Sequence, residues 1–283
     1  MPEQLYPRTI YFEADANKQD IFQRLKENEF NFPIIGKPDS GGRGRGVKIL
    51  KNEADLEKYI THTPVDFHIQ EFIRFENEVG IFYYRYPNQA SGTISGIVRK
   101  EFLKVSGDGI HSIRSLLQKN NRALLQMNSL EKIFGATLGY ILKKGEERIL
   151  SPYGNHARGA KFFDDSQLAD DRLTQVIDGI CKKIKDFHFG RLDIRYNDWE
   201  ELKQGKNFSV IEVNGAGSEP THMYDPRHTI FFAWKEIIRH WIILCRISRM
   251  NHKTGSAYLS VKEGIAMFRE DKMHSAKLLQ IPE

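Results

Sequence analysis

The feature that most constrains the fold is a short apolar strand that ends in a lysine and runs straight into a glycine-rich loop. The strand covers Phe32 to Pro38 with Lys37 near its end, and glycines follow at Gly41, Gly42, Gly44 and Gly46. Glycines allow backbone N–H groups to approach phosphate oxygens closely. The loop is neither a P-loop pattern nor followed at once by a helix, which excludes the P-loop and Rossmann interpretations. We therefore predict a phosphate-binding loop between two strands, the alternative being an ordinary flexible hairpin turn.

A second pattern occupies two later strands, predicted over 189–196 and 208–214. Side chains two positions apart share a strand face, so Arg191 points the same way as Asp193, and Glu212 the same way as Asn214. Antiparallel pairing would bring both pairs over one site. Two carboxylates and an amide oxygen suit Mg²⁺ that bridges phosphates. The alternative is a salt-bridged surface hairpin.

Hydrophobic periodicity indicates a mixture of helices and strands in the rest of the chain. Helices are predicted near 17–28, 112–120, 129–142 and 170–187, strands over 67–73, 78–86 and 93–102, and a mobile active-site loop over 143–165. Between 230 and 247, apolar residues recur every three or four positions, at Phe231, Trp234, Ile238, Trp241 and Cys245. This spacing predicts one buried stripe of an amphipathic helix. Charged residues interrupt the segment, so no transmembrane span is expected.

Composition narrows the partners and the compartment. The 283 residues hold 42 Lys and Arg against 37 Asp and Glu, a net charge of +5 that suits anionic ligands. No basic block is interleaved with aromatic residues, so nucleic acid is not expected as a partner. The two cysteines, Cys181 and Cys245, form no CxxC pair, and no signal-peptide pattern occupies the first residues. A reduced, cytoplasmic compartment is therefore the expectation.

The strand lysine, the glycine-rich loop and the late strand pair follow one another along the chain in an order that resembles the ATP-grasp superfamily, and the resemblance covers about 17–226. The resemblance implies an α+β ATP-grasp fold in which two α+β subdomains clasp ATP between antiparallel sheets. It divides the chain into a connector or remnant of a preceding domain (1–16), an N-terminal subdomain (17–73), a C-terminal subdomain with the metal site (74–250) and a basic C-terminal tail (251–283).

Within the superfamily, two segments look like those of D-alanine–D-alanine ligases: 190–193, which reads Gly-Arg-Leu-Asp, and 212–214, which reads Glu-Val-Asn. The middle of the chain, at 98–100, 105–113 and 155–159, looks like the ATP-grasp part of cyanophycin synthetase. These resemblances imply an ATP-dependent carboxylate–amine ligase that forms an amide, or peptide-like, bond through an acyl-phosphate. Its cofactors would be ATP and Mg²⁺, with Mn²⁺ as a possible substitute. Its partners would be a small molecule or peptide with a carboxylate and an amine co-substrate.

The resemblance also assigns roles to residues. The nucleotide contacts would be Lys37, Ser40, Gly41, Gly42, Arg43, Gly44, Gly46, Gln70, Glu71, Phe72, Ile73 and Glu78. The metal ligands would be Asp193, Glu212 and Asn214, and the catalytic residues Arg191 and Lys37. Polar residues of two loops are candidates for substrate contacts, namely Asn155, His156, Arg158, Glu219 and His222.

Two departures leave the substrates open. Residues 215–222 differ from the Pro-Gly-Met-Thr type loop that reads the second substrate in D-alanine ligases, and sixteen residues before the core cannot form the front domain that such ligases carry. Either a preceding segment is missing, or the substrate pocket is assembled differently. Two alternatives remain, an ATP-grasp small-molecule kinase and a non-catalytic ATP-binding module. The sequence does not predict the oligomeric state.

Overall fold

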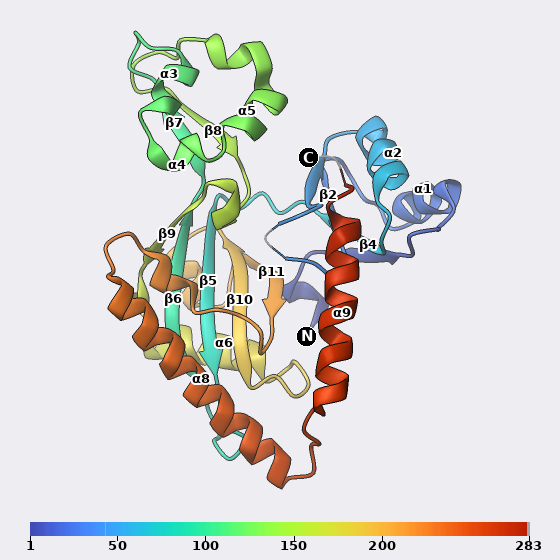
Figure 1. The fold of residues 1–283 in the computed structure, drawn as a ribbon, viewed down its shortest axis with the longest axis vertical. Helices are drawn as coiled ribbons and strands as arrows, with labels where there is room; N and C mark the ends of the chain where they lie inside the picture. The colour runs from blue at the N-terminus through green and yellow to red at the C-terminus, as the bar shows by residue number, and fades with distance from the viewer. Residues whose placement is uncertain (43, 282–283) are drawn as a thin grey trace.

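The computed structural model describes residues 1–42 and 44–281. Its smaller lobe is an antiparallel sheet in the order β1-β4-β2-β3, formed by β1 (Thr9–Phe12), β2 (Ile34–Pro38), β3 (Lys48–Leu50) and β4 (Phe67–Glu71). Helices α1 (Lys18–Glu27) and α2 (Glu53–His62) pack on one face of this sheet (Figure 1). Asn17 and Asn52 cap the two helices by accepting hydrogen bonds from backbone N–H groups of the first turn.

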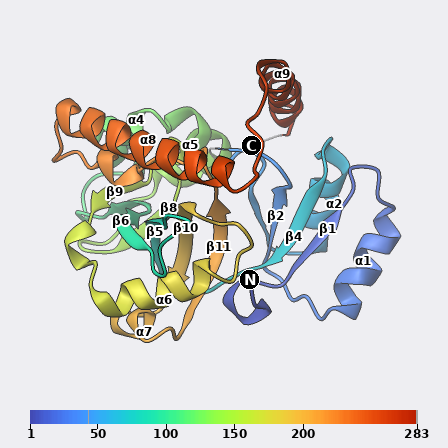
Figure 2. The same ribbon diagram turned by 90° about the horizontal axis from the view of Figure 1, so that it is seen from below.

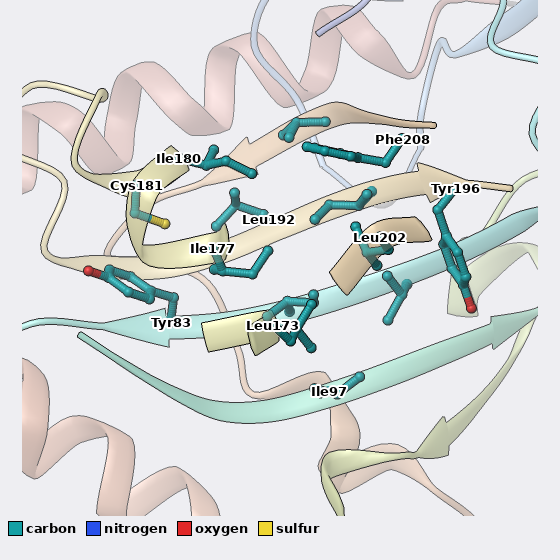
Figure 3. Close-up of a cluster of buried hydrophobic side chains, with 14 of the residues drawn as sticks. Tyr83, Ile97, Leu173, Ile177, Ile180, Cys181, Leu192, Tyr196, Leu202 and Phe208 are labelled. Atoms are coloured by element: carbon teal, nitrogen blue, oxygen red, sulfur yellow. The ribbon is translucent and has the colours of Figure 1, made fainter. Parts of the chain in front are cut away.

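The larger lobe is a five-stranded antiparallel sheet in the order β11-β10-β5-β6-β9. Its strands are β5 (Asn77–Tyr84), β6 (Thr93–Glu101), β9 (Lys161–Asp164), β10 (Phe189–Tyr196) and β11 (Phe208–Asn214). One face packs against α6 (Asp171–Cys181) and α7 (Trp199–Lys203), and Figure 3 shows the resulting core, with Ile97, Leu173, Ile177 and Leu192 among its members. Alternate residues of these strands must therefore point to the opposite face. The predicted α+β class with antiparallel sheets is confirmed.

A third small core lies between residues 103 and 151. Strands β7 (Leu103–Ser106) and β8 (Glu147–Ser151) pair with each other, and α3 (Ile113–Gln118), α4 (Asn121–Leu124) and α5 (Met127–Phe134) pack beside them. Figure 1 shows this part at the end of the larger lobe. The prediction of a mobile loop over 143–165 is wrong, because the segment contains both β8 and β9. The remaining short elements are the 3₁₀ helices η1 (Glu3–Leu5), η2 (Gly135–Gly139), η3 (His156–Arg158), η4 (Ser166–Leu168) and η5 (Thr221–Tyr224).

Both ends of the chain are more structured than predicted. At the N-terminus, where a connector or a remnant of a preceding domain was predicted, Thr9–Phe12 form β1, which pairs with β4 from Thr9↔Gln70 to Phe12↔Phe67. The predicted C-terminal tail contains an 18-residue helix, α9 (Val261–Leu278), whose last turn reaches the small lobe (Figure 1).

The long helix α8 (Ile230–Lys253) lies on the larger sheet with the opposite face from the one predicted. Its buried residues are Glu236, His240, Ile243 and Ile247, while the predicted stripe of Phe231, Trp234, Ile238, Trp241 and Cys245 is exposed. The prediction of a buried aromatic stripe is therefore wrong. No helix within the described residues is long and apolar enough to cross a membrane.

Candidate functional site

A set of charged and polar side chains occupies the face of the larger sheet that points away from α6. We call the set the charged face; its members are Glu78 of β5, Lys100 of β6, Arg191, Asp193 and Arg195 of β10, and Glu212 and Asn214 of β11. The strand register brings them together. Arg191 lies opposite Asn214 and Asp193 opposite Glu212, while Glu78 faces both Arg195 and Lys100. The predicted antiparallel pairing of 189–196 with 208–214 is confirmed.

Buried ion pairs link the members of the charged face. Lys100 Nζ lies 2.9 Å from Glu78 Oε1 and 3.1 Å from Asp193 Oδ2, and all three side chains are buried. Arg195 Nε lies 3.0 Å from the other Glu78 oxygen. Gly80 leaves room for this packing, because a Cβ there would lie 3.0 Å from Asp193 Oδ1 and 2.8 Å from a Val98 methyl group.

Arg191 and Asp193 form the best-aligned pair. Arg191 Nε and Nη2 donate to the two Asp193 oxygens at 2.8 and 3.1 Å, a bidentate contact that only a guanidinium can make. Burial alone would raise the pKa of Asp193, but Arg191 and Lys100 hold it well below its usual range. Asp193 is therefore an anion at every physiological pH, and the guanidinium of Arg191 is already engaged.

Glu212 and Asn214 form the open side of the charged face. The Glu212 carboxylate is exposed at the edge strand β11, and the Asn214 amide, oriented to suit its neighbours, donates to Glu212 Oε1 at 3.1 Å and accepts from Arg191 Nη2 at 3.3 Å. Partial removal from water and the negative charge of Asp193 raise the pKa of Glu212. A carboxylate that is hard to ionise and lies beside another anion is suited to receive a cation.

Lys37, on β2 of the small lobe, contacts β11 of the large lobe next to the charged face. Its Nζ donates to Gln70 Oε1 at 3.1 Å and to the backbone oxygen of Ile211, on β11, at 3.3 Å. Burial lowers the pKa of Lys37, and the nearby Glu212 opposes that shift. Gln70 is itself held by Thr9, to which its amide donates at 2.9 Å. Figure 2 shows β11 beside β2, so the lysine of one sheet reaches the acidic edge of the other.

The glycine-rich loop between β2 and β3 has the backbone that its sequence predicts. Gly44 and Gly46 have φ of 69° and 70°, in the left-handed region that favours glycine. Two short turns, from Arg45 N to Gly42 O and from Val47 N to Gly44 O, fold the loop. Ser40 and Gly41 lie at its start, where α9 contacts them, and Arg43 lies outside the described residues.

The next predicted nucleotide residues lie at the end of β4 and just after it. Glu71 ends the strand and its carboxylate pairs with Arg8 at 3.3 Å, while half-buried Phe72 and Ile73 begin the link to the large lobe. Arg195 binds the same link, donating to the Phe75 carbonyl at 3.0 Å. These residues thus lie at the junction of the two sheets.

The 154–158 loop bridges the charged face and the glycine-rich loop. A side chain at Gly154 would collide with Glu78, and Arg158 Nη1 donates to the Val47 carbonyl at 3.1 Å. Asn155 lies beside Gly44 and accepts from the Ala157 N–H. His156 instead packs its ring on Phe162 and Tyr224, at centroid distances of 5.2 and 5.3 Å.

Of the last two predicted substrate residues, only one lies near the charged face. The backbone oxygen of Glu219 accepts from Arg191 at 3.4 Å, and its carboxylate accepts from the Tyr224 hydroxyl. His222 is buried against Gly96 and lies 3.2 Å from Glu236 beneath α8. The structure does not bring His222 together with the charged face.

Sequence reasoning gave no role to Lys100 and Arg195. Arg195 continues the alternation of Arg191 and Asp193, so the strand pattern could have identified it, whereas the role of Lys100 depends on the β5–β6 register.

A cavity of about 680 Å³ between β3 and α5 was also not predicted from the sequence. Arg158, Tyr153 and Ile281 line it, but no charged-face residue does, so it is a separate feature beside the glycine-rich loop.

The oxygen donors of the charged face fit a hard divalent cation. Within residues 1–42 and 44–281, no group of three or more His, Cys, Asp or Glu side chains is placed to hold a metal by itself. Magnesium is commonly bound by one or two carboxylates together with substrate phosphates. Glu212 and Asn214 on the open side, with Asp193 behind them, form a partial set of this kind.

Curated proteins similar to this chain match only part of it. A bifunctional glutathione biosynthesis protein of Listeria monocytogenes is 28% identical over 172 residues, which cover 52% of this chain and 22% of that protein. Its counterpart in Listeria welshimeri is 25% identical over 194 residues, covering 60% and 24%. This chain thus spans less than a quarter of the length of the curated relatives it matches. No family model matches the chain.

Among solved structures, a bifunctional glutathione synthetase from Pasteurella multocida is 17% identical with a TM-score of 0.43, covering 85% of this chain and 34% of that one. A D-Ala:D-Ser ligase from Enterococcus faecalis is 14% identical with a TM-score of 0.46, covering 84% and 57%. The comparisons thus find the chain similar to bifunctional glutathione biosynthesis proteins, which agrees with the resemblance to ligases that the motifs predict.

Proposed function

We propose that this chain is the ATP-using part of a magnesium-dependent carboxylate–amine ligase. The observation that supports this most strongly is the contact between the two sheets. Lys37, which precedes the glycine-rich loop, reaches the β11 backbone beside Glu212, and Arg191 and Asp193 lie on the neighbouring strand. This contact supports the proposal because a lysine, with a glycine-rich loop after it, reaches an edge strand that carries carboxylate and amide oxygens, and transfer of a phosphoryl group would use such a set.

Each group has a chemical task in the proposed reaction. The glycine-rich loop would hold the phosphates, and Lys37 would offset negative charge on the oxygens between the transferred and leaving groups. Glu212, Asn214 and Asp193 would hold Mg²⁺, for which Mn²⁺ can substitute; the metal would act as a Lewis acid and template when bound. Gln70 through Ile73, together with Glu78, would contact the nucleoside.

The substrate carboxylate would attack the terminal phosphate, releasing ADP and forming an acyl-phosphate. An amine would then attack the acyl carbon, forming the amide and releasing inorganic phosphate. Arg191 would stabilise the oxyanion of this second step, with its guanidinium fixed in place by Asp193. The carboxylate substrate is a small molecule or peptide, and Asn155, Arg158 and Glu219 are the proposed contacts, since they border the charged face and the loop.

A product assay separates this proposal from its alternatives. The chain is mixed with ATP, Mg²⁺ and pools of amino acids and short peptides, and ADP release is followed in the presence and absence of hydroxylamine. A ligase gives ADP, inorganic phosphate and a hydroxamate, because hydroxylamine captures the acyl-phosphate. A small-molecule kinase gives a stable phosphorylated acceptor and no hydroxamate. A non-catalytic ATP-binding module releases no ADP with any pool.

A matched pair of variants ties the result to the site. Glu212→Gln should abolish ADP release, whereas Glu147→Gln, which removes an exposed carboxylate that pairs with Lys104, should leave it unchanged. Equal activity in the two variants would contradict the proposed role of Glu212. A cytoplasmic location is part of the proposal, consistent with two cysteines that form no disulfide.

A further inference from the structure

Helix α8 presents a continuous apolar face that no described part of the chain covers. We call Phe231, Trp234, Ile238, Trp241 and Ile242 the aromatic face; Phe231 is 73% exposed and Trp241 70%. Their spacing of three, four, three and one residues keeps them on one side of the helix. Isolated exposed apolar residues are ordinary, but a contiguous aromatic stripe marks an interaction surface.

The opposite side of α8 fixes this orientation. Ile243 and Ile247 pack with Phe82 and Phe189 of the large sheet. The buried His240 lies 2.9 Å from Ser95 Oγ through Nε2, and Glu236 lies 3.2 Å from His222. Rolling the helix to bury its tryptophans would break these buried polar contacts, which is costly. The aromatic face is therefore a property of the folded lobe.

Charge distinguishes the possible occupants of the aromatic face. Helix α8 carries Lys235, Arg239, Arg246, Arg249 and Lys253, all exposed, and its single acid, Glu236, is only 5% exposed. The exposed side of the helix thus presents large apolar side chains together with these five cationic ones and no exposed acid. A second copy related by a two-fold axis would place this cationic helix against itself, and like charges oppose such pairing. The complementary partner is apolar and anionic.

We propose that α8 binds the surface of a membrane that contains anionic lipids. A helix with aromatic residues on one side and Lys and Arg beside them lies in the plane of the interface, where tryptophan is favoured. The helix is about 36 Å long at 1.5 Å per residue, and no described helix can span a bilayer. The lobe would therefore rest on the bilayer through α8. This inference goes beyond the proposed ligase activity and does not require it.

Vesicle sedimentation tests the proposal with the whole chain. Vesicles of phosphatidylcholine alone are compared with vesicles of phosphatidylcholine mixed with phosphatidylglycerol, at low and high salt. We expect binding to the mixed vesicles, weakened about tenfold or more without phosphatidylglycerol or at high salt, since the Lys and Arg attraction is screened. Trp234 and Trp241 should shift their fluorescence to shorter wavelength on binding.

Three variants make the test specific. Trp241→Ser should weaken vesicle binding about tenfold or more, and the double change Arg246→Gln with Arg249→Gln should remove the preference for anionic lipid. Leu125→Ser, which removes an 82% exposed leucine far from α8 in sequence, is the control and should bind as the unchanged chain does. All three changes are at exposed positions, and melting curves check that each variant is folded.

Two outcomes would overturn the proposal. One is equal binding of the unchanged chain and Trp241→Ser to the mixed vesicles. The other is absence of vesicle binding together with a dimer, seen by light scattering, that Trp241→Ser dissociates; that result would assign the aromatic face to a second copy of the chain.

Discussion

Replacing Lys100 by methionine would test the buried ion pairs on which the charged face depends. The change keeps side-chain length but leaves two buried carboxylates, Glu78 and Asp193, without the ammonium group between them. Breaking a buried pair costs about 3–5 kcal/mol, and because each carboxylate keeps one guanidinium, we expect about 3 kcal/mol. For a chain of this size that lowers Tm by about 6 °C. The loss should shrink in acid, because Asp193 without Lys100 takes up a proton more readily.

The control is Lys104→Met on β7. Lys104 pairs with Glu147 at 3.0 Å, a distance close to that of the Lys100 pairs, but both side chains of this pair are exposed. Such a pair contributes about 0–1 kcal/mol. Urea unfolding followed by circular dichroism measures both variants, with equal slopes showing that the midpoint reports stability. A loss below about 1 kcal/mol for Lys100→Met would refute the argument that the charged face is a desolvated network.

Three further predictions concern the charged face and the glycine-rich loop. Arg191→Lys keeps the charge but loses the planar guanidinium that holds Asp193. In steady-state kinetics we expect kcat to fall about 10²-fold, with the KM for ATP nearly unchanged. An intact kcat would exclude a transition-state role for Arg191. The pKa of Glu212 is raised in the folded chain, so its ionised form opposes folding above that pKa. Glu212→Gln should therefore melt at the same or a higher temperature than the unchanged chain at pH 7, and the difference should vanish in acid. A lower Tm of the variant at pH 7 would contradict the sign of the shift. His274→Ala removes the 2.7 Å contact between α9 and the Ser40 carbonyl, so amides of residues 39–42 should exchange faster by mass spectrometry, and unchanged exchange would show that α9 does not order the loop.

The strand pairs of the charged face could be predicted because two simple rules determine them. Period-two alternation places Arg191 with Asp193 and Glu212 with Asn214, and the consecutive strands 189–196 and 208–214 pair antiparallel across the connection 197–207, which contains α7. The lysine-ended strand and its glycines were likewise recognisable, since left-handed backbone at Gly44 and Gly46 requires glycine.

Features that depend on tertiary register or on orientation could not be predicted in this way. Lys100 joins the charged face only because β6 pairs with β5, and the sequence of β6 alone does not fix that register. On α8, the apolar stripe was assigned to the core by the usual rule for amphipathic helices, but the structure buries Glu236 and His240, whose polar groups find partners beneath the helix. Hydrophobic periodicity identifies the faces of a helix, and the polar contacts decide which face is inside.

Calorimetric titration of the chain with ATP in the presence of Mg²⁺ tests the central claim most directly. The account predicts heat of binding with a dissociation constant between about 1 μM and 1 mM, and stabilisation of about 2.7 kcal/mol at 100 times that constant. The heat should fall sharply when Mg²⁺ is withheld and in Glu212→Gln, but not in the control Glu147→Gln. Absence of both heat and thermal stabilisation with the unchanged chain would contradict the assignment of the inter-sheet site to ATP.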